Sequence, residues 1–184
     1  MLFRSPALST IPFGGIVLQD CEQFTCRWNR IRGNGASHGD PIVGIFVGSG
    51  EALAFEGNHI VENGPRAGST NLKLNGLRGG IFVKASALTA ASYKGESGDV
   101  QYGPPALKVH GNVVQAPLGP ALLVRARGPV FVEGNQLVSH GTPPREEQSG
   151  VTSAAVIIGN LGFGGEFIGL LQLTAWLLDR KSVV

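Results

Sequence analysis

Short runs of apolar residues recur along this chain, each led by a glycine or an alanine. In three of these runs the spacing can be counted from the residue after the leading glycine or alanine. An asparagine stands thirteen residues after that residue, and an isoleucine or a leucine stands fifteen residues after the same residue. The aligned runs are Gly15-Ile16-Val17-Leu18, Gly44-Ile45-Phe46-Val47 and Ala121-Leu122-Leu123-Val124. Repetition at a fixed spacing predicts one structural unit stacked on copies of itself.

Two further copies of the unit are less regular. Gly80-Ile81-Phe82-Val83 begins a fourth copy, whose remainder at 107–114 follows an insertion of about 18 residues. A fifth copy begins at Ala155-Val156-Ile157-Ile158 and continues irregularly. We therefore expect a stack of about five units.

Each copy contains three segments in which inward and outward positions alternate, as expected of short β-strands separated by turns. The positions that we expect to face inward are Ile16, Leu18, Ile45, Val47, Ile81, Val83, Leu122, Val124, Val156 and Ile158 in the first segment, Phe24, Cys26, Leu53, Phe55, Leu107, Val109, Val130 and Val132 in the second, and Ile31, Ile60, Val114 and Leu137 in the third. Since all of them are apolar, the sequence predicts one dry core, to which each side chain contributes roughly 1.5–3 kcal/mol on burial.

An asparagine recurs where the second segment of a copy turns into the third. The four positions are Asn29, Asn58, Asn112 and Asn135. Asparagine tolerates a left-handed backbone and bonds to neighbouring backbone groups, so it suits a tight turn. Stacked turns of this kind predict a ladder of amide side chains. An alternative is that these amides form a row that binds a glycan.

The pattern Gly-Ile-x-Val, followed by Gly-Asn-x-Ile-x-x-Asn-Gly, resembles the repeats of the right-handed parallel β-helix of the pectin-lyase-like superfamily. The resemblance covers roughly residues 13–162. It implies an all-β, right-handed solenoid of about five coils. That fold supports polysaccharide lyases, hydrolases and non-catalytic scaffolds, so it does not by itself indicate a function. On the analogy of the fold alone, an extracellular or cell-surface location is favoured.

The outward residue of every first segment is also apolar. These residues are Val17, Phe46, Phe82, Leu123 and Ile157, and stacking would join them into one outer stripe. A soluble protein seldom leaves such a stripe bare. We expect either that the chain's own loops or termini cover it, or that it binds a protein partner or the rest of a larger parent chain.

Three insertions, at 36–43, 65–79 and 142–153, fall between the last segment of one copy and the first segment of the next. They should project from one edge of the stack, and their charged residues include His38, Asp40, Arg66, Lys73, Arg78 and Arg145. Binding residues concentrate on loops held by a rigid scaffold, so this edge is a candidate surface for a partner or a polysaccharide. The plain alternative is that repeat proteins tolerate insertions there.

Few residues have the spacing of a catalytic site. One outward column alternates acids with bases or potential bases: Arg27, Glu56, His110 and Glu133. Opposite charges on neighbouring strands attract, so a solvated charge ladder is one interpretation and a catalytic pair of Glu and His is another. His38 and Asp40 form the one compact polar pair with the character of a site. As a general base supported by a carboxylate the pair would need a partner residue, and none is adjacent in sequence.

The composition narrows the classes of function. Apolar residues make up 42% and charged residues 15% of the chain, which argues against disorder. No window reaches the roughly 18 apolar residues of a membrane-spanning helix, and no basic patch interleaved with aromatic residues indicates nucleic-acid binding. Cys21 and Cys26 have no His or Cys at ligand spacing, so we expect free thiols, with Cys26 buried, and neither a metal nor a cofactor.

The two ends of the sequence resemble translated sequencing-adapter sequence. These segments are Met1–Ser5 and Asp179–Val184, so we expect the natural protein segment to be residues 6–178, a single domain cut at both ends. Leaving the two segments out removes the small excess of positive charge, which is the second reason not to expect nucleic acid as a partner.

We therefore expect a non-catalytic β-helix scaffold or interaction module that binds a protein partner or a glycan through its edge loops and outer stripe. The alternative is an extracellular polysaccharide lyase or glycoside hydrolase. The resemblance implies that a lyase of this fold would typically hold a calcium ion with several carboxylates, and that a hydrolase would use two closely placed carboxyl groups. Asp20, Asp40 and Asp99 occupy neither equivalent nor adjacent positions of the repeat, which favours the first interpretation.

Overall fold

The computed structural model describes residues 13–35, 42–64, 78–89, 103–140, 155–160 and 170–171. Within these ranges the chain is all-β and contains no helix. The strands are β1 (Phe13–Glu22), β2 (Thr25–Arg27), β3 (Arg30–Arg32), β4 (Ile42–Glu51), β5 (Leu53–Glu56), β6 (His59–Val61), β7 (Gly79–Ala87), β8 (Leu107–His110), β9 (Val113–Ala116), β10 (Leu122–Arg127), β11 (Val130–Glu133), β12 (Gln136–Ser139), β13 (Val156–Asn160) and β14 (Leu170–Leu171). Both terminal segments that resemble adapter sequence lie outside the described residues.

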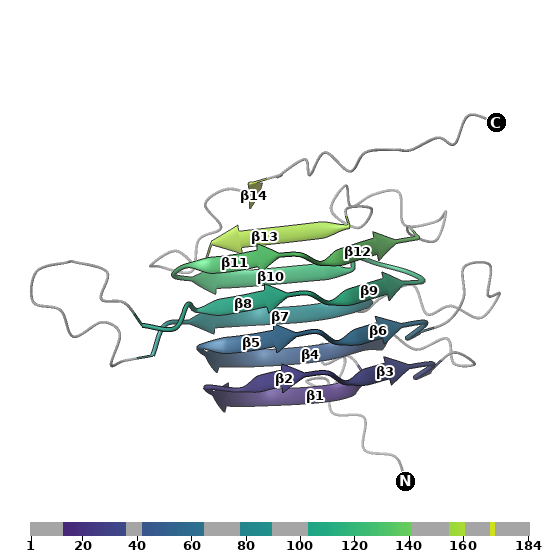
Figure 1. The fold of residues 1–184 in the computed structure, drawn as a ribbon, viewed down its shortest axis with the longest axis horizontal. Coiled ribbons are helices and arrows are strands. Elements are labelled where there is room, and N and C mark those ends of the chain that lie inside the picture. Colours follow the sequence, from purple (N-terminus) through teal and green to yellow (C-terminus); the bar gives the residue numbers. More distant parts are fainter. Residues whose placement is uncertain are drawn as a thin grey trace, which may run out of the picture.

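The strands form three sheets, and each strand from β1 to β10 is a neighbour of the described strand three places further along the chain, while β14 joins the first sheet beside β13 (Figure 1). The first sheet has the order β1-β4-β7-β10-β13-β14, the second β11-β8-β5-β2 and the third β12-β9-β6-β3. Every pair of described strands is parallel except β13 with β14, which is antiparallel. We call each set of three consecutive strands, such as β1–β3, a level. This stack of parallel strands is compatible with a parallel β-solenoid.

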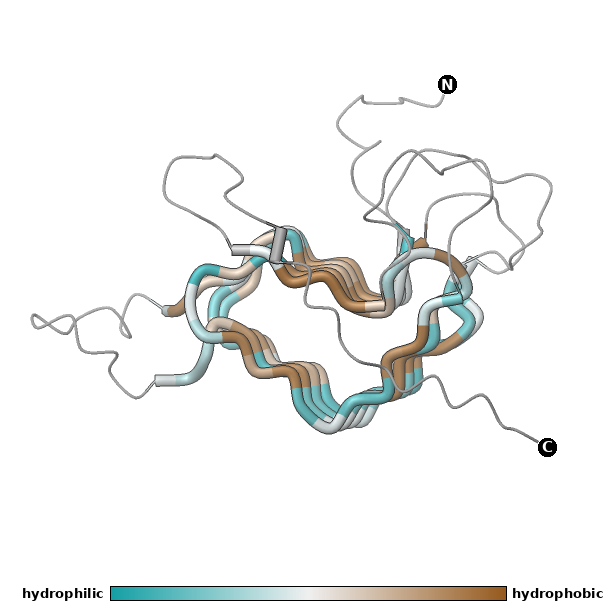
Figure 2. The backbone as a smooth tube through the Cα atoms, turned by 90° about the horizontal axis from the view of Figure 1, so that it is seen from above, coloured by the Kyte–Doolittle hydropathy of each residue, from teal (hydrophilic) through white to brown (hydrophobic). Residues whose placement is uncertain are grey.

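The register of the first sheet is the one that the repeat predicts. Ile45 pairs with Ile16 on one side and with Ile81 on the other, and Leu122 pairs with Ile81 and with Val156. Equivalent residues of successive levels therefore lie above one another. Figure 2, which views the stack from above, shows the levels superposed with residues of similar hydropathy in columns.

The apolar core fills the space that the three sheets enclose. Val47, Phe55 and Ile60, one from each sheet, are fully buried. The core becomes more exposed where β11 and β12 are the last described strands of their sheets: Leu137 is only partly buried, and Val132, which the pattern places inward, is 36% exposed. The interior is therefore dry in the middle of the stack and open toward this end.

Glycines close the first three levels where the third strand approaches the first. A Cβ atom on Gly15 would collide with the side chain of Ile31, and one on Gly44 would collide with the side chain of Ile60. The carbonyl oxygen of Gly80 in the next level lies only 2.7 Å from the Cβ position of Gly44. In these three levels the glycine that leads the apolar run is therefore required by packing, because no side chain fits between the strands. Ala121 leads the run of the following level, so the requirement does not extend to that level.

Candidate functional site

The outer face of the second sheet carries the charged column that the repeat predicts. The strands β2, β5, β8 and β11 bring its four members into register: Arg27, Glu56, His110 and Glu133. Arg27, His110 and Glu133 are exposed, and Glu56 is partly exposed. The structure thus assembles these candidate residues on one accessible face, with neighbours one strand apart.

Glu56 is held in its ionised form by a residue that the sequence pattern did not single out. The Nζ atom of Lys108 lies 2.8 Å from the Oε1 atom of Glu56. This hydrogen bond is the largest cause that lowers the pKa of Glu56, and the positive charges of Lys108, Arg27 and His110 lower it further, while partial desolvation opposes them. Lys108 precedes His110 by two residues on β8, so strand alternation places it on the same face.

Glu56 does not suit the role of proton donor in glycoside hydrolysis. A glycosidase needs one carboxyl group with a raised pKa as proton donor, whereas the pKa of Glu56 is lowered. Glu133 stands two strands away from Glu56, with His110 between them, so the carboxylates are about 10 Å apart at the spacing of neighbouring strands. In the described part of the chain, no three side chains of His, Cys, Asp or Glu gather in a way that could hold a metal ion.

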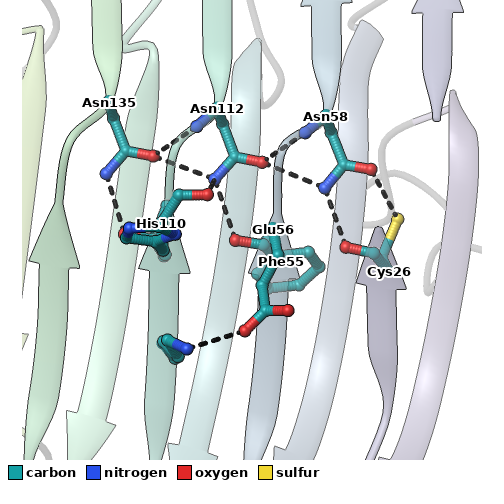
Figure 3. Close-up of polar contacts among 9 residues, drawn as sticks. Cys26, Phe55, Glu56, Asn58, His110, Asn112 and Asn135 are labelled. Carbon is teal, nitrogen blue, oxygen red and sulfur yellow. Dashed lines mark hydrogen bonds and ion pairs between the residues drawn. The ribbon is translucent and has the colours of Figure 1, made fainter. Parts of the chain in front are cut away.

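The turn asparagines form the expected ladder (Figure 3). The Oδ1 atom of Asn58 accepts a hydrogen bond from the backbone N–H of Asn29 at 3.0 Å, and Asn112 accepts from Asn58 at 2.9 Å. Asn135 accepts in the same way from Asn112 at 2.8 Å. Each of these oxygens also accepts from the side-chain amide of the preceding asparagine. The ladder therefore links the turns of four levels.

The amide groups of the ladder are turned into the protein. The Nδ2 atom of Asn58 donates to the carbonyl oxygen of Cys26, and that of Asn112 donates to the carbonyl oxygen of Phe55, both at 2.8 Å. Asn58 is 1% exposed and Asn112 is 0% exposed. A glycan cannot reach these two amides, so the interpretation of the row as a binding surface is wrong for the middle of the stack and the ladder is structural.

A second, shorter ladder joins Asn34 and Asn63. The Oδ1 atom of Asn63 accepts from the backbone N–H of Asn34 at 3.2 Å and from its Nδ2 atom at 2.8 Å. Asn63 in turn donates to the carbonyl oxygen of Ile31 at 2.9 Å. The sequence contained the signal for this ladder, because the two residues are 29 positions apart, as Asn29 and Asn58 are.

Both cysteines are free thiols. Cys26 is buried, and desolvation raises the pKa of its thiol, against the opposing effect of the hydrogen bond from Asn29. The pKa of Cys21 is also raised, first by desolvation and then by the negative charge of Asp20. Raised pKa values keep both sulfurs protonated and make them poor nucleophiles.

Trp28 is the most exposed large apolar residue of the described chain, and sequence reasoning missed it. Its side chain is 78% exposed, and its backbone is left-handed, with φ of 57°. The equivalent residues of the next three levels are Gly57, Gly111 and Gly134, whose φ angles lie between 61° and 64°. The indole ring lies against Gly57, in the space that a Cβ atom on residue 57 would need. The signal was a tryptophan at a position that is otherwise glycine.

The outer stripe of the first sheet is in register but is not uniformly exposed. Val17 pairs with Phe46, Phe46 with Phe82, and Phe82 with Leu123, which pairs with Ile157. The rings of Phe46 and Phe82 stack with their centroids 5.7 Å apart, yet the residues are only 2% and 7% exposed. Val17 is 40% exposed. A partner could therefore reach the end of the stripe at Val17 but not its two phenylalanines.

Most of the edge-loop candidates lie outside the described residues. These are His38, Asp40, Arg66, Lys73 and Arg145. Arg78 is described, and it is only 8% exposed, so its side chain offers little surface to a ligand.

No helix long and apolar enough to cross a membrane occurs in the described part of the chain. Comparison with known protein families, with curated proteins and with solved structures gives no match for this chain.

Proposed function

We propose that the stack is a right-handed parallel β-helix of about five coils, of the kind found in the pectin-lyase-like superfamily. The parallel pairing of every third strand supports a helical path of the chain. Connections between parallel strands of one sheet are right-handed in about 98% of cases. The recurring Asn turns and the inward apolar columns support the same assignment.

On this scaffold we propose a non-catalytic interaction module that binds a protein partner or a glycan. Trp28 is the observation that carries the proposal. A bulky residue in the left-handed region costs about 1–2 kcal/mol relative to glycine, and three other levels use glycine at this position. Strain of this kind, together with 78% exposure, is typical of a residue retained for binding rather than for packing.

The surroundings of Trp28 suit binding better than catalysis. Arg27 and Arg30 are exposed on either side of the turn, and Phe131, 57% exposed, lies at the far end of the same face. Tryptophan and arginine are the residues most often found as energetic anchors of interfaces. The edge loops and the end of the outer stripe at Val17 are further candidate contacts.

Two measurements test the proposal. The purified chain is incubated with uronate and neutral polysaccharides, and the release of reducing or unsaturated ends is followed. We expect no turnover, because Glu56 is paired with Lys108 and stands two strands away from Glu133. Turnover that disappears in Glu133→Gln would instead establish the alternative, a polysaccharide lyase or glycoside hydrolase.

Binding is measured separately by retardation of the folded chain in gels that contain each polysaccharide. Trp28→Gly removes the exposed ring and leaves a residue that suits the backbone. If a glycan binds at this face, the retardation is lost in Trp28→Gly and kept in Lys84→Ser, an exposed position of β7 on the first sheet. Equal retardation of Trp28→Gly and the wild type by a bound glycan would remove Trp28 from the proposal.

A further inference from the structure

The charged column of the second sheet is complementary to itself when its order is reversed. Read along the stack, the column runs Arg27, Glu56, His110, Glu133. Placed against a second copy in the opposite direction, Arg27 meets Glu133 and Glu56 meets His110, and each pairing occurs twice. His110 can donate a hydrogen bond to a carboxylate in either protonation state. No position in the column meets a like charge.

The two columns of residues that flank the charged column are also compatible with this reversed arrangement of two copies. Trp28 would stand opposite Gly134 of the second copy, so the largest side chain of the turn column faces a residue without a side chain. In the other flanking column, Phe131 would stand opposite Thr25, and Lys108 opposite Ala54. In both flanking columns no two large residues face each other, so the two faces can approach closely.

Only one two-fold arrangement gives these pairings. An axis that lies between the faces and along the strands reverses the order of levels and keeps each column opposite itself. An axis along the stack keeps the order of levels, so Arg27 approaches Arg27 and Glu133 approaches Glu133. Like charges on facing surfaces are costly, and the first arrangement is therefore selected. A two-fold contact of this kind is closed, since residue i of one copy meets j of the other and j meets i.

We propose that this face binds a second copy of the chain in the reversed, two-fold arrangement. The inference rests on the proposed function, because it names the partner of the face that carries Trp28. All of the strands involved, β2, β5, β8 and β11, are described, and both ends of the face are exposed. Four strands about 4.8 Å apart make a face smaller than the roughly 800 Å² per partner of a standard interface. The dimer is therefore weak and sensitive to salt.

Charge reversal tests the arrangement directly. The full chain is studied by sedimentation equilibrium over a series of concentrations at low and high salt. The wild type forms a dimer that dissociates as salt is added. Arg27→Glu places a glutamate opposite Glu133 at both symmetric contacts, so the dissociation constant rises by about tenfold or more. The double variant Arg27→Glu with Glu133→Arg restores opposite charges across the interface and recovers the dimer.

Controls separate the interface from the fold. Within one copy, Arg27→Glu also stands beside Glu56, and the double variant keeps that unfavourable neighbour. Recovery of the dimer in the double variant therefore cannot come from repair of the monomer. Lys84→Glu makes the same change of charge at an exposed position of β7 in the first sheet, outside the face, and leaves the dimer unchanged. Trp28→Gly weakens the dimer without loosening the fold, as circular dichroism and urea denaturation record.

Three results would overturn the inference: a wild type that is monomeric at every concentration, a dimer that survives Arg27→Glu, or a double variant as monomeric as the single one. None of these results touches the proposed function itself, which fails instead if the chain turns over a polysaccharide. Loss of glycan retardation in Trp28→Gly, found with a monomeric wild type, would uphold the binding module and refute its self-association.

Discussion

Asn112 stands in the middle of the amide ladder, and its removal tests what holds the levels in register. Its Oδ1 atom is the acceptor for the backbone N–H of Asn58 at 2.9 Å, and its Nδ2 atom donates to the carbonyl oxygen of Phe55 at 2.8 Å. Asn112→Ala leaves both of these buried groups without that partner. A buried donor or acceptor that loses its hydrogen bond costs about 1–3 kcal/mol. We expect Asn112→Ala to lower the free energy of unfolding by about 3–4 kcal/mol, a large part of the roughly 5–15 kcal/mol typical of a domain.

Asn29→Ala is the matched control, because it removes the same side chain from the exposed end of the ladder. Asn58 keeps its hydrogen bond from the backbone of Asn29, so the expected loss is about 1 kcal/mol. Urea titrations followed by circular dichroism give both free energies, compared at equal slope. Equal losses for Asn112→Ala and Asn29→Ala would refute the idea that burial of the ladder is what makes it stabilising.

Asn112→Asp extends the test, since it keeps the shape and the acceptor but replaces the donor. The new carboxylate faces the carbonyl oxygens of Phe55 and His110 and the amide oxygen of Asn135. Burial among oxygens raises the pKa of an acid. The folded state of the variant therefore favours the protonated form, so its loss of stability is largest at high pH and shrinks as the pH falls. A loss that does not depend on pH would contradict this account.

Three further outcomes follow from the same structure. Trp28→Gly should raise the free energy of unfolding by about 0.5–1 kcal/mol, because glycine accepts the left-handed backbone without strain; a fall in stability would show that the indole packs more strongly than its exposure implies. Gly44→Ala should destabilise by about 1–3 kcal/mol through overpacking, whereas Gly159→Ala, where the nearest atom to a Cβ is 3.8 Å away, should be close to neutral in the same titration. Cys26 should react with a thiol reagent only on unfolding, since it is 3% exposed and its pKa is raised, while the partly exposed Cys21 reacts first; simultaneous modification in the native state would contradict the burial of Cys26.

The register of the levels could be predicted from the sequence, although strand alternation alone does not determine it. In the first sheet the outward residues of the apolar runs are apolar as well. A slip of one position would therefore place Val17 in the core instead of Ile16, and no polar residue of the run would be buried. Two other signals decide the matter. The glycine that leads the run must lie where Ile31 approaches, and the asparagine must reach the turn of the next level. The steric constraint at the glycine and the hydrogen bond of the asparagine thus determine the register of the strands, which the pattern of apolar residues alone does not.

The burial of the outer stripe could not be predicted in the same way. Phe46 and Phe82 repeat in register, and the repeat says only that they point away from the core. They form a small cluster of their own with Val43 and Leu123 on the other side of the sheet. The repeat fixes the direction of these side chains but not their exposed fractions, which are 2% and 7%. Glu56 illustrates the same limit, because the column showed its charge but not the contact with Lys108.

Departures from the repeat are therefore the places where this chain carries information beyond its fold. Every level must satisfy the same backbone at the second turn, and glycine does so at three positions with φ between 61° and 64°. A tryptophan at the fourth position gains little from packing, since 78% of it is exposed, and it costs conformational energy that glycine would not. Neither the core nor the ladder explains Trp28. A contact with a second copy of the chain would explain it. The charged column beside Trp28 is complementary to the same column of a second copy in the reversed orientation, so this face can supply that contact.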